Sequence, residues 1–158
     1  NIHGMPLAAC LGLGDKRLFE TMDSPVPFLL PENLFYIGSR SIDPGEEEIL
    51  KKYNLIILLV IFIIISAVLS PDFLTIGNFL IHLSFDVDFM DAAEFTATGL
   101  PIPDGPSIAQ THTTLKTLFS DPRVCSADFV EYSPVHDQNQ EGLAVCVSLL
   151  EEIFSSLK

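Results

Sequence analysis

The sequence predicts an α/β fold in which helices flank a parallel sheet. Strand patterns and helical patterns alternate along the chain, and this alternation favours parallel strands joined through helices. Four strands are expected, near residues 34–39, 55–61, 80–88 and 124–132. The 158 residues are enough for one domain with its own hydrophobic core, so we expect a single domain over residues 1–158.

The charge balance excludes one class of partner. There are 21 acidic and 8 basic residues, so the Lys/Arg surface that neutralises nucleic-acid phosphates is missing. An acidic surface suits cationic substrates or divalent metals, or serves solubility alone. The three cysteines form no Cys-x-x-Cys pair, and no secretory signal pattern follows Asn1. We therefore expect a reducing, cytoplasmic location.

Two helix starts are marked by their flanking residues. Asp43 is placed to cap a helix beginning at Pro44, with Glu46 as its reciprocal partner in a capping box. Pro6 likewise suits the first turn of a short helix. Residues 15–33 are rich in proline and charge, which predicts a loop.

The segment 55–69 is unusual because Ser66 is its only polar residue. As a helix it would be about 22 Å long, short of the roughly 30 Å hydrocarbon core of a membrane. The alternative is a buried strand over 55–61 that leads into a core helix, which the β-branched residues favour. Residues 54–80 also resemble the first membrane helix of sugar ABC-transporter permeases, so association with a membrane through 55–69 stays open.

Two further helices are expected over residues 108–119 and 142–157. The first places Leu115, Leu118 and Phe119 on one side. The second is strongly amphipathic and predicts a packing helix. Its expected apolar stripe consists of Leu143, Cys146, Val147, Leu150, Phe154 and Leu157.

The stretch from Ile81 to Asp88 carries the most chemical information. Apolar and polar residues alternate along it, so a strand would send Asp86 and Asp88 to one face, about 7 Å apart. Carboxylates this close repel each other unless a cation lies between them, and hard divalent ions are the usual partners. The alternative is a pair of solvated aspartates where a strand meets a turn.

Four short motifs, in this order, resemble the ureohydrolase family and arginases in particular. They are Asn1–Pro6, Ser39–Glu46, Ser84–Asp88 followed by Asp91 and Thr96–Pro101, and the weaker Asp128–Pro134. Within these motifs the loop after Asp88 departs from the family at several positions, including Phe89 where glycine is usual.

The resemblance implies an enzyme that hydrolyses the C–N bond of a linear amidine. The implied substrate is L-arginine, the products are urea and ornithine, and the implied cofactor is a pair of Mn²⁺ ions. Asp86 and Asp88 match metal ligands, and His3 matches a histidine implicated in proton transfer. Substrate-binding roles fall on Asn1, Asp43 and Glu131, and Glu131 would receive the guanidinium group.

Each of these residues also has a plain structural explanation. Asp43 can serve as a helix cap alone, Glu131 as a solvated residue at a strand end, and His3 as a surface histidine.

The resemblance covers only the second half of the family. The family's Gly-Gly-Asp-His and Asp-Ala-His-x-Asp stretches, which carry further metal ligands, do not occur in these 158 residues. Two aspartates cannot fill a two-ion site alone. We therefore expect an incomplete arginase-like domain that binds Mn²⁺ weakly and hydrolyses arginine poorly or not at all. The alternatives are a metal-free arginase-like subunit and a membrane-anchored composite protein, both without catalysis. Family analogy also implies a homo-oligomer.

Overall fold

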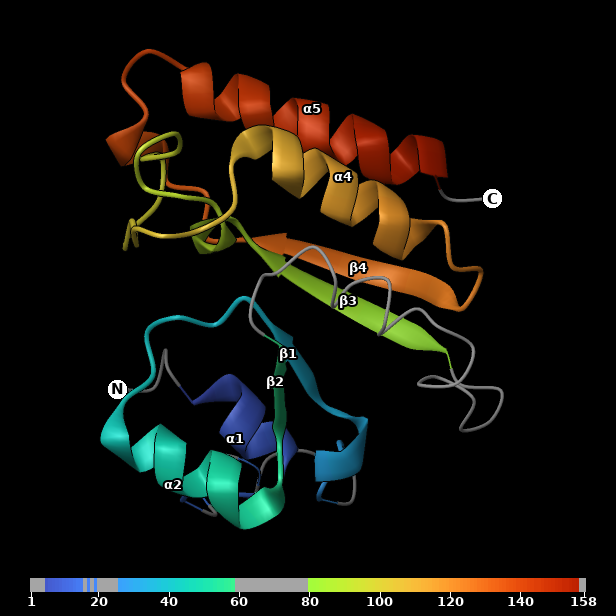
Figure 1. The fold of residues 1–158 in the computed structure, drawn as a ribbon. Helices are drawn as coiled ribbons and strands as arrows, with labels where there is room; N and C mark the ends of the chain where they lie inside the picture. Colours follow the sequence, from blue (N-terminus) through green and yellow to red (C-terminus); the bar gives the residue numbers. More distant parts are fainter. Residues whose placement is uncertain (1–4, 16, 18, 20–25, 59–79, 157–158) are drawn as a thin grey trace. The chain divides into compact units, whose positions relative to one another are not determined.

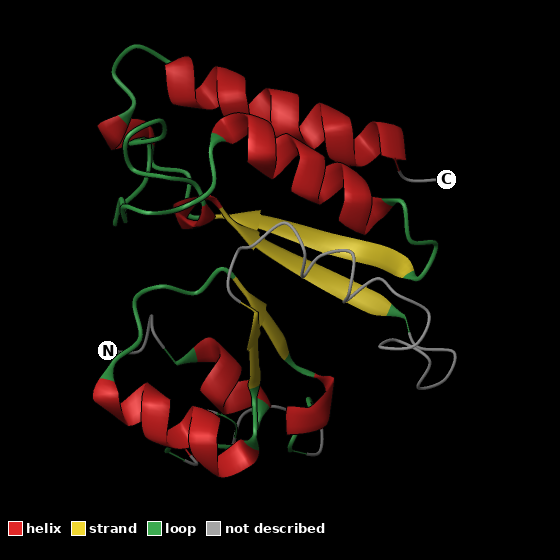
Figure 2. Cartoon of the chain, viewed as in Figure 1, coloured by secondary structure: helices red, strands yellow, loops and turns green. Residues whose placement is uncertain are grey.

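The computed structural model describes residues 5–15, 17, 19, 26–58 and 80–156 (Figures 1 and 2). The chain divides into two units. One comprises residues Asn1–Ile37 and Ile42–Leu58, and the other comprises Gly38–Ser41 and Leu59–Lys158. Asn1 and His3 lie outside the described residues.

The first unit contains one parallel strand pair with helices around it. Its elements are α1 (Pro6–Cys10), the 3₁₀ turn η3 (Pro31–Asn33), β1 (Phe35–Ile37), α2 (Pro44–Tyr53) and β2 (Ile56–Leu58). β1 and β2 run parallel, with Phe35 opposite Ile56. The predicted cap of α2 is confirmed, because the Asp43 main-chain N–H donates to Glu46 Oε2 at 2.9 Å.

The unusual apolar segment is described only at its beginning. The predicted strand over 55–61 is present as β2, Ile56–Leu58, and pairs parallel to β1. Residues 59–79, which include most of 55–69, lie outside the described part of the chain. Within the described ranges, no helix is both long and apolar enough to cross a membrane.

The second unit is built on the parallel pair β3 and β4. Its elements are β3 (Ile81–Asp86), η4 (Val87–Phe89), α4 (Ile108–Phe119), β4 (Val124–Val130), η5 (Pro134–His136) and α5 (Glu141–Ser156). Ser84 pairs with Asp128 and Asp86 with Val130. Both α4 and α5 lie on the same side of this pair (Figure 1). The predicted α/β class with a parallel sheet flanked by helices is therefore confirmed.

The core of this unit lies between β3 and the two helices. The predicted inward positions of α4, Leu115, Leu118 and Phe119, are all buried. The main cluster consists of Phe85, Val87, Met90, Phe95, Ala97, Leu115, Phe119, Val124, Cys146, Leu149 and Ile153.

The predicted apolar stripe of α5 is partly wrong. Leu143, Val147 and Phe154 are 40%, 46% and 69% exposed. The buried positions are instead Gly142, Cys146, Leu149 and Ile153. The reason is a close approach at Gly142, where an added Cβ would lie 2.2 Å from the Cβ of Ala97. Hydrophobicity counts on the helix cannot register this contact, because it depends on the absence of a side chain.

The cap of α4 gives a stability prediction. Ser107 Oγ accepts the Gln110 N–H at 3.1 Å, and Gln110 Oε1 accepts the Ser107 N–H at 2.8 Å. Ser107→Ala should lower the free energy of unfolding by about 1 kcal/mol, measured by urea denaturation. Ser155→Ala, at an exposed position in the last turn of α5, is the control and should leave the denaturation midpoint nearly unchanged. Equal losses in both variants would contradict the capping role.

Candidate functional site

The two aspartates of the Ser-Phe-Asp-Val-Asp stretch occupy different local structures. β3 ends at Asp86, and Asp88 lies in the 3₁₀ turn η4 that follows. The expectation that a strand period places both carboxylates on one face is therefore wrong for Asp88. The Asp86 side chain accepts the Asp88 main-chain N–H at 2.8 Å, so Asp86 caps the turn that redirects the chain.

Asp88 is half-buried and carries a perturbed carboxylate. Burial raises the pKa of Asp88, and the negative charge of Glu131 raises it further. A hydrogen bond from Thr98 Oγ1 and the positive charge of Arg40 act in the opposite direction. Because burial is the largest of these effects, the carboxylate has a pKa above its ordinary value of 3.8.

Two chain segments bring these groups together. Thr98 forms an isolated antiparallel bridge with Tyr132, and the Ser133 N–H donates to the Ala97 carbonyl at 2.9 Å. The loop after β3 is thus joined to the segment after β4. Asp88 and Glu131 consequently lie within electrostatic range of each other, each just after one of two neighbouring parallel strands, and open α/β sheets bind ligands beyond such carboxyl ends.

The sequence predicted Glu131 near the C-terminal end of a strand over 124–132, but β4 ends at Val130 and Glu131 directly follows it with a strained backbone. Its φ angle is 69°, in the left-handed region that residues other than glycine rarely adopt. Strain of this kind gathers at functional sites, where the surrounding structure holds it. The bridge at Tyr132 is the neighbouring contact that holds this conformation.

The loop between η4 and α4 is fixed by two carboxylates. Asp91 accepts the main-chain N–H groups of Ala93 at 2.7 Å and Gly105 at 2.9 Å. Glu94 accepts the N–H of Ile108 at 2.8 Å, at the start of α4. Because the loop is held at both ends, Thr98 and Asp88 have defined positions.

The exposed face of the strand pair carries a hydrogen-bonded polar cluster. His82 Nδ1 lies 2.9 Å from Ser126 Oγ, and His82 Nε2 lies 3.0 Å from Asp128 Oδ2. Ser84 Oγ donates to Asp128 Oδ1 at 2.6 Å. These contacts run across the strand register and satisfy the polar side chains that alternate along β3.

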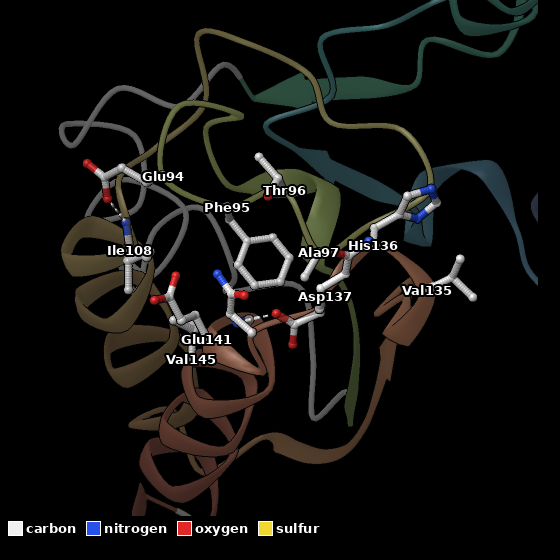
Figure 3. A pocket seen from close by; sticks show the side chains of 13 residues that line it. Glu94, Phe95, Thr96, Ala97, Ile108, Val135, His136, Asp137, Glu141 and Val145 are labelled. Atoms are coloured by element: carbon white, nitrogen blue, oxygen red, sulfur yellow. Dashed lines mark hydrogen bonds between the residues drawn. The ribbon is translucent and has the colours of Figure 1, made fainter.

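A separate pocket lies beside this loop and the start of α5. It has a volume of about 660 Å³, and Figure 3 shows Phe95, Ala97, His136 and Asp137 among its lining residues. The Asp137 carboxylate accepts the N–H groups of Gly142 and Leu143 and the hydroxyl of Tyr132. That carboxylate thus serves mainly to anchor α5. The pocket is lined by none of the residues predicted to be functional.

The remaining predicted site residues are not part of this cluster. Asp43 belongs to the first unit, as the cap of α2, and Asn1 and His3 lie outside the described residues. Within the described part of the chain, no group of three or more His, Cys, Asp or Glu side chains is arranged to hold a metal ion. Asp86 and Asp88 are therefore two ligand candidates, short of a complete set.

Sequence reasoning assigned no role to Thr98 or Arg40. Both stand within the motifs that carry the resemblance, but neither residue type signals a site by itself. Only the fold shows that both influence Asp88.

Comparison with known proteins gives a consistent result. A model of the arginase family matches residues 1–155. The arginase of Brevibacillus brevis is 33% identical over 98% of this chain and 53% of its own length. The crystal structure of Bacillus subtilis arginase superposes with a TM-score of 0.85 at 31% identity, over 97% of this chain and 54% of that one. The structure of Entamoeba histolytica arginase in complex with L-ornithine has a TM-score of 0.83 at 29% identity, over 98% of this chain and 52% of that one.

These comparisons bear on two of the sequence-based expectations. The chain spans about half the length of the curated relatives it matches. The family match also runs through residues 54–80, and no comparison supports the resemblance of that segment to a sugar permease.

The environment of Asp88 predicts that ionisation of its carboxylate lowers the stability of the fold. Its folded-state pKa is raised, so its contribution to stability is fully present below its unfolded pKa and is lost as the pH rises through the folded pKa. Asp88→Asn removes that loss. In metal-free buffer, the melting temperature of Asp88→Asn should exceed that of the unsubstituted protein by an amount that grows as the pH rises above about 4.

The matched control is Asp104→Asn. Asp104 is exposed in the same loop at a φ of 63°, which asparagine tolerates, so this variant removes one negative charge from the same loop without relieving burial. Its melting-temperature difference should stay small across the pH range. If both variants gained stability equally with pH, the effect would be one of net charge.

Proposed function

The chain belongs to the arginase family, and from this premise we propose that its residues form part of a manganese-dependent site that hydrolyses the guanidinium group of L-arginine. The products would be urea and ornithine. An arginase of this family from Entamoeba histolytica has been crystallised with L-ornithine, which supports the choice of substrate. The chain covers about half of such relatives, so the proposal concerns the part of the site that these residues supply.

The observation that carries the proposal is the position of Asp88. Its carboxylate is desolvated and lies within the electrostatic reach of Glu131, an arrangement that costs free energy in the absence of a cation. A divalent ion or a guanidinium group removes that cost. The positions of these carboxylates beyond the strand ends therefore fit a site for cations better than a role in stability.

The ligand chemistry fits manganese only in part. Asp86 and Asp88 offer the hard oxygen ligands that Mn²⁺ accepts, but two carboxylates are too few to hold two Mn²⁺ ions tightly. When bound, Mn²⁺ supplies the Lewis acid that makes water a nucleophile near neutral pH. Further ligands would have to come from outside the described residues. We propose that this chain alone binds Mn²⁺ weakly and releases little or no urea.

The substrate roles follow the charges of the substrate. Glu131 would accept the planar guanidinium group through its two carboxylate oxygens. Asp43 would contact the α-amino group in addition to capping α2. His3 would carry a proton, a role for which histidine is the usual residue near neutral pH, and Asn1 would contribute to substrate binding.

Removing either ligand candidate should weaken metal binding. Asp86→Asn and Asp88→Asn should each reduce Mn²⁺ affinity roughly tenfold or more, the scale seen when even outer partners of a metal site are lost. Affinity is measured from the electron paramagnetic resonance signal of free Mn²⁺. Asp104→Asn, with the same charge change in the same loop, should bind as the unsubstituted protein does. Equal affinity in all four proteins would contradict the ligand roles of Asp86 and Asp88. Robust urea release from the unsubstituted chain would contradict the expectation that this chain alone has little activity.

The proposed substrate roles of Asp43 and Glu131 can be distinguished by comparing the affinities of two ligands. Asp43→Asn keeps the helix cap, because asparagine caps as well as aspartate. It should weaken binding of L-arginine but not of δ-guanidinovalerate, which lacks the α-amino group. Glu131→Gln should weaken the binding of both ligands. Titration calorimetry in the presence of Mn²⁺ measures each affinity. Loss of both ligands in Asp43→Asn would instead point to a structural role.

Two implications of the resemblance stay predictions. One is assembly into a homo-oligomer, which light scattering on the purified protein tests. The other is a cytoplasmic location.

A further inference from the structure

Arg40 makes an unusual set of contacts with the loop that carries Asp88. Within the described part of the chain, its guanidinium donates to main-chain carbonyls and to no side chain. Nη2 reaches Asp88 O at 2.9 Å, Ile102 O at 3.1 Å and Met90 O at 3.4 Å. Nη1 reaches Phe89 O at 2.9 Å and Gly38 O at 3.2 Å, and Nε reaches Pro103 O at 3.1 Å.

Apart from Gly38 O, the acceptors lie at the two ends of one loop. The first group covers residues 88–90, directly after β3, and the second covers 102–103, shortly before α4. The same ends are joined by main-chain bonds, from Asp91 N to Pro106 O at 2.9 Å and from Ala92 N to Ile102 O at 3.2 Å. Arg40 therefore closes the base of the loop that holds Thr98 and Asp88.

The position of the guanidinium requires glycine at residue 105. An added Cβ there would lie 2.8 Å from Arg40 Nη2, 2.7 Å from Phe89 O and 2.8 Å from Asp91 N. Two of these three atoms are main-chain atoms that cannot move cheaply. Gly99, in the same loop, has nothing within 4 Å of the corresponding point.

We propose that Arg40 is a positioning residue: its guanidinium fixes the base of the 88–105 loop and so holds the main chain of Asp88 in place for cation binding. The role needs the planar group with five donors, because a lysine ammonium at the same position cannot reach both ends of the loop. The reference to cation binding rests on the proposed function, while the effect on the loop can be measured without it.

The test is native-state hydrogen exchange at single amides, followed by NMR in metal-free buffer. In Arg40→Lys the amides of Asp91 and Ala92 should exchange at least about tenfold faster, the scale of losing charge-assisted hydrogen bonds. The amides of α5 should not change. Gly105→Ala should reproduce the same local pattern, and Gly99→Ala is the matched control that leaves it unchanged. Unaltered exchange in Arg40→Lys, or equal acceleration in α5, would overturn the proposal.

Chemical rescue separates positioning from general stability. Arg40→Ala leaves space for a free guanidinium ion, so low-millimolar guanidinium chloride should restore protection of the Asp91 and Ala92 amides, while sodium chloride at equal concentration should not. No difference between the two salts would contradict the guanidinium role.

Mn²⁺ binding tests whether the contacts of Arg40 with the 88–105 loop affect the site. If the unsubstituted protein binds Mn²⁺, Arg40→Lys should bind it several-fold more weakly, whereas Arg123→Lys, at the distant end of β4, should not. Equal affinities would overturn the part of the inference that concerns cation binding. If the unsubstituted protein does not bind Mn²⁺, the proposed function fails, and the exchange measurements alone decide the role of Arg40.

Discussion

The carboxylate of Asp88 is partly buried and is repelled by the negative charge of Glu131. The surrounding structure has to maintain this unfavourable arrangement. The Thr98 hydroxyl and the Arg40 guanidinium offset part of the cost. Both come from loops, so the order of those loops decides whether the two acidic groups stay together. Asp91, Glu94 and the bridge between Thr98 and Tyr132 supply that order.

The rigid support behind these loops is the packing of α4 and α5 against β3. The side chains that point from β3 toward the helices are apolar, and the helices close over them. The loop of the site takes part in this packing, because its apolar residues Val87, Met90, Phe95 and Ala97 belong to the core. Apolar burial thus anchors the loop, while hydrogen bonds to the main chain place its charged groups.

Local signals in the sequence predicted much of this fold. The caps at Asp43 and the bounds of α4 follow from residues that act within one helical turn, and the structure confirms both. Glu131 could also be placed near a strand end, because Pro134 closes the strand pattern shortly after it. These features depend on neighbours in sequence, which a single sequence displays.

Most of what could not be predicted depends on contacts between distant segments. The exception is the turn at Asp88, where local capping by Asp86 outweighs an alternation that predicts a continuous strand. The inward face of α5 is set by Gly142 against Ala97, and the position of Asp88 depends on Arg40, 48 residues earlier. A resemblance to a family could direct attention to Asp86, Asp88 and Glu131, but it assigned nothing to the residues that hold them.

The left-handed backbone of Glu131, with its φ of 69°, makes the residue type at this position informative about use of the site. Glycine or asparagine would occupy such a conformation at less cost than glutamate does. Selection for thermal stability alone would favour replacement of the glutamate. Among descendants of this sequence, an acidic residue kept at this point would mark lineages in which the site is still used, and glycine would mark those that keep only the scaffold.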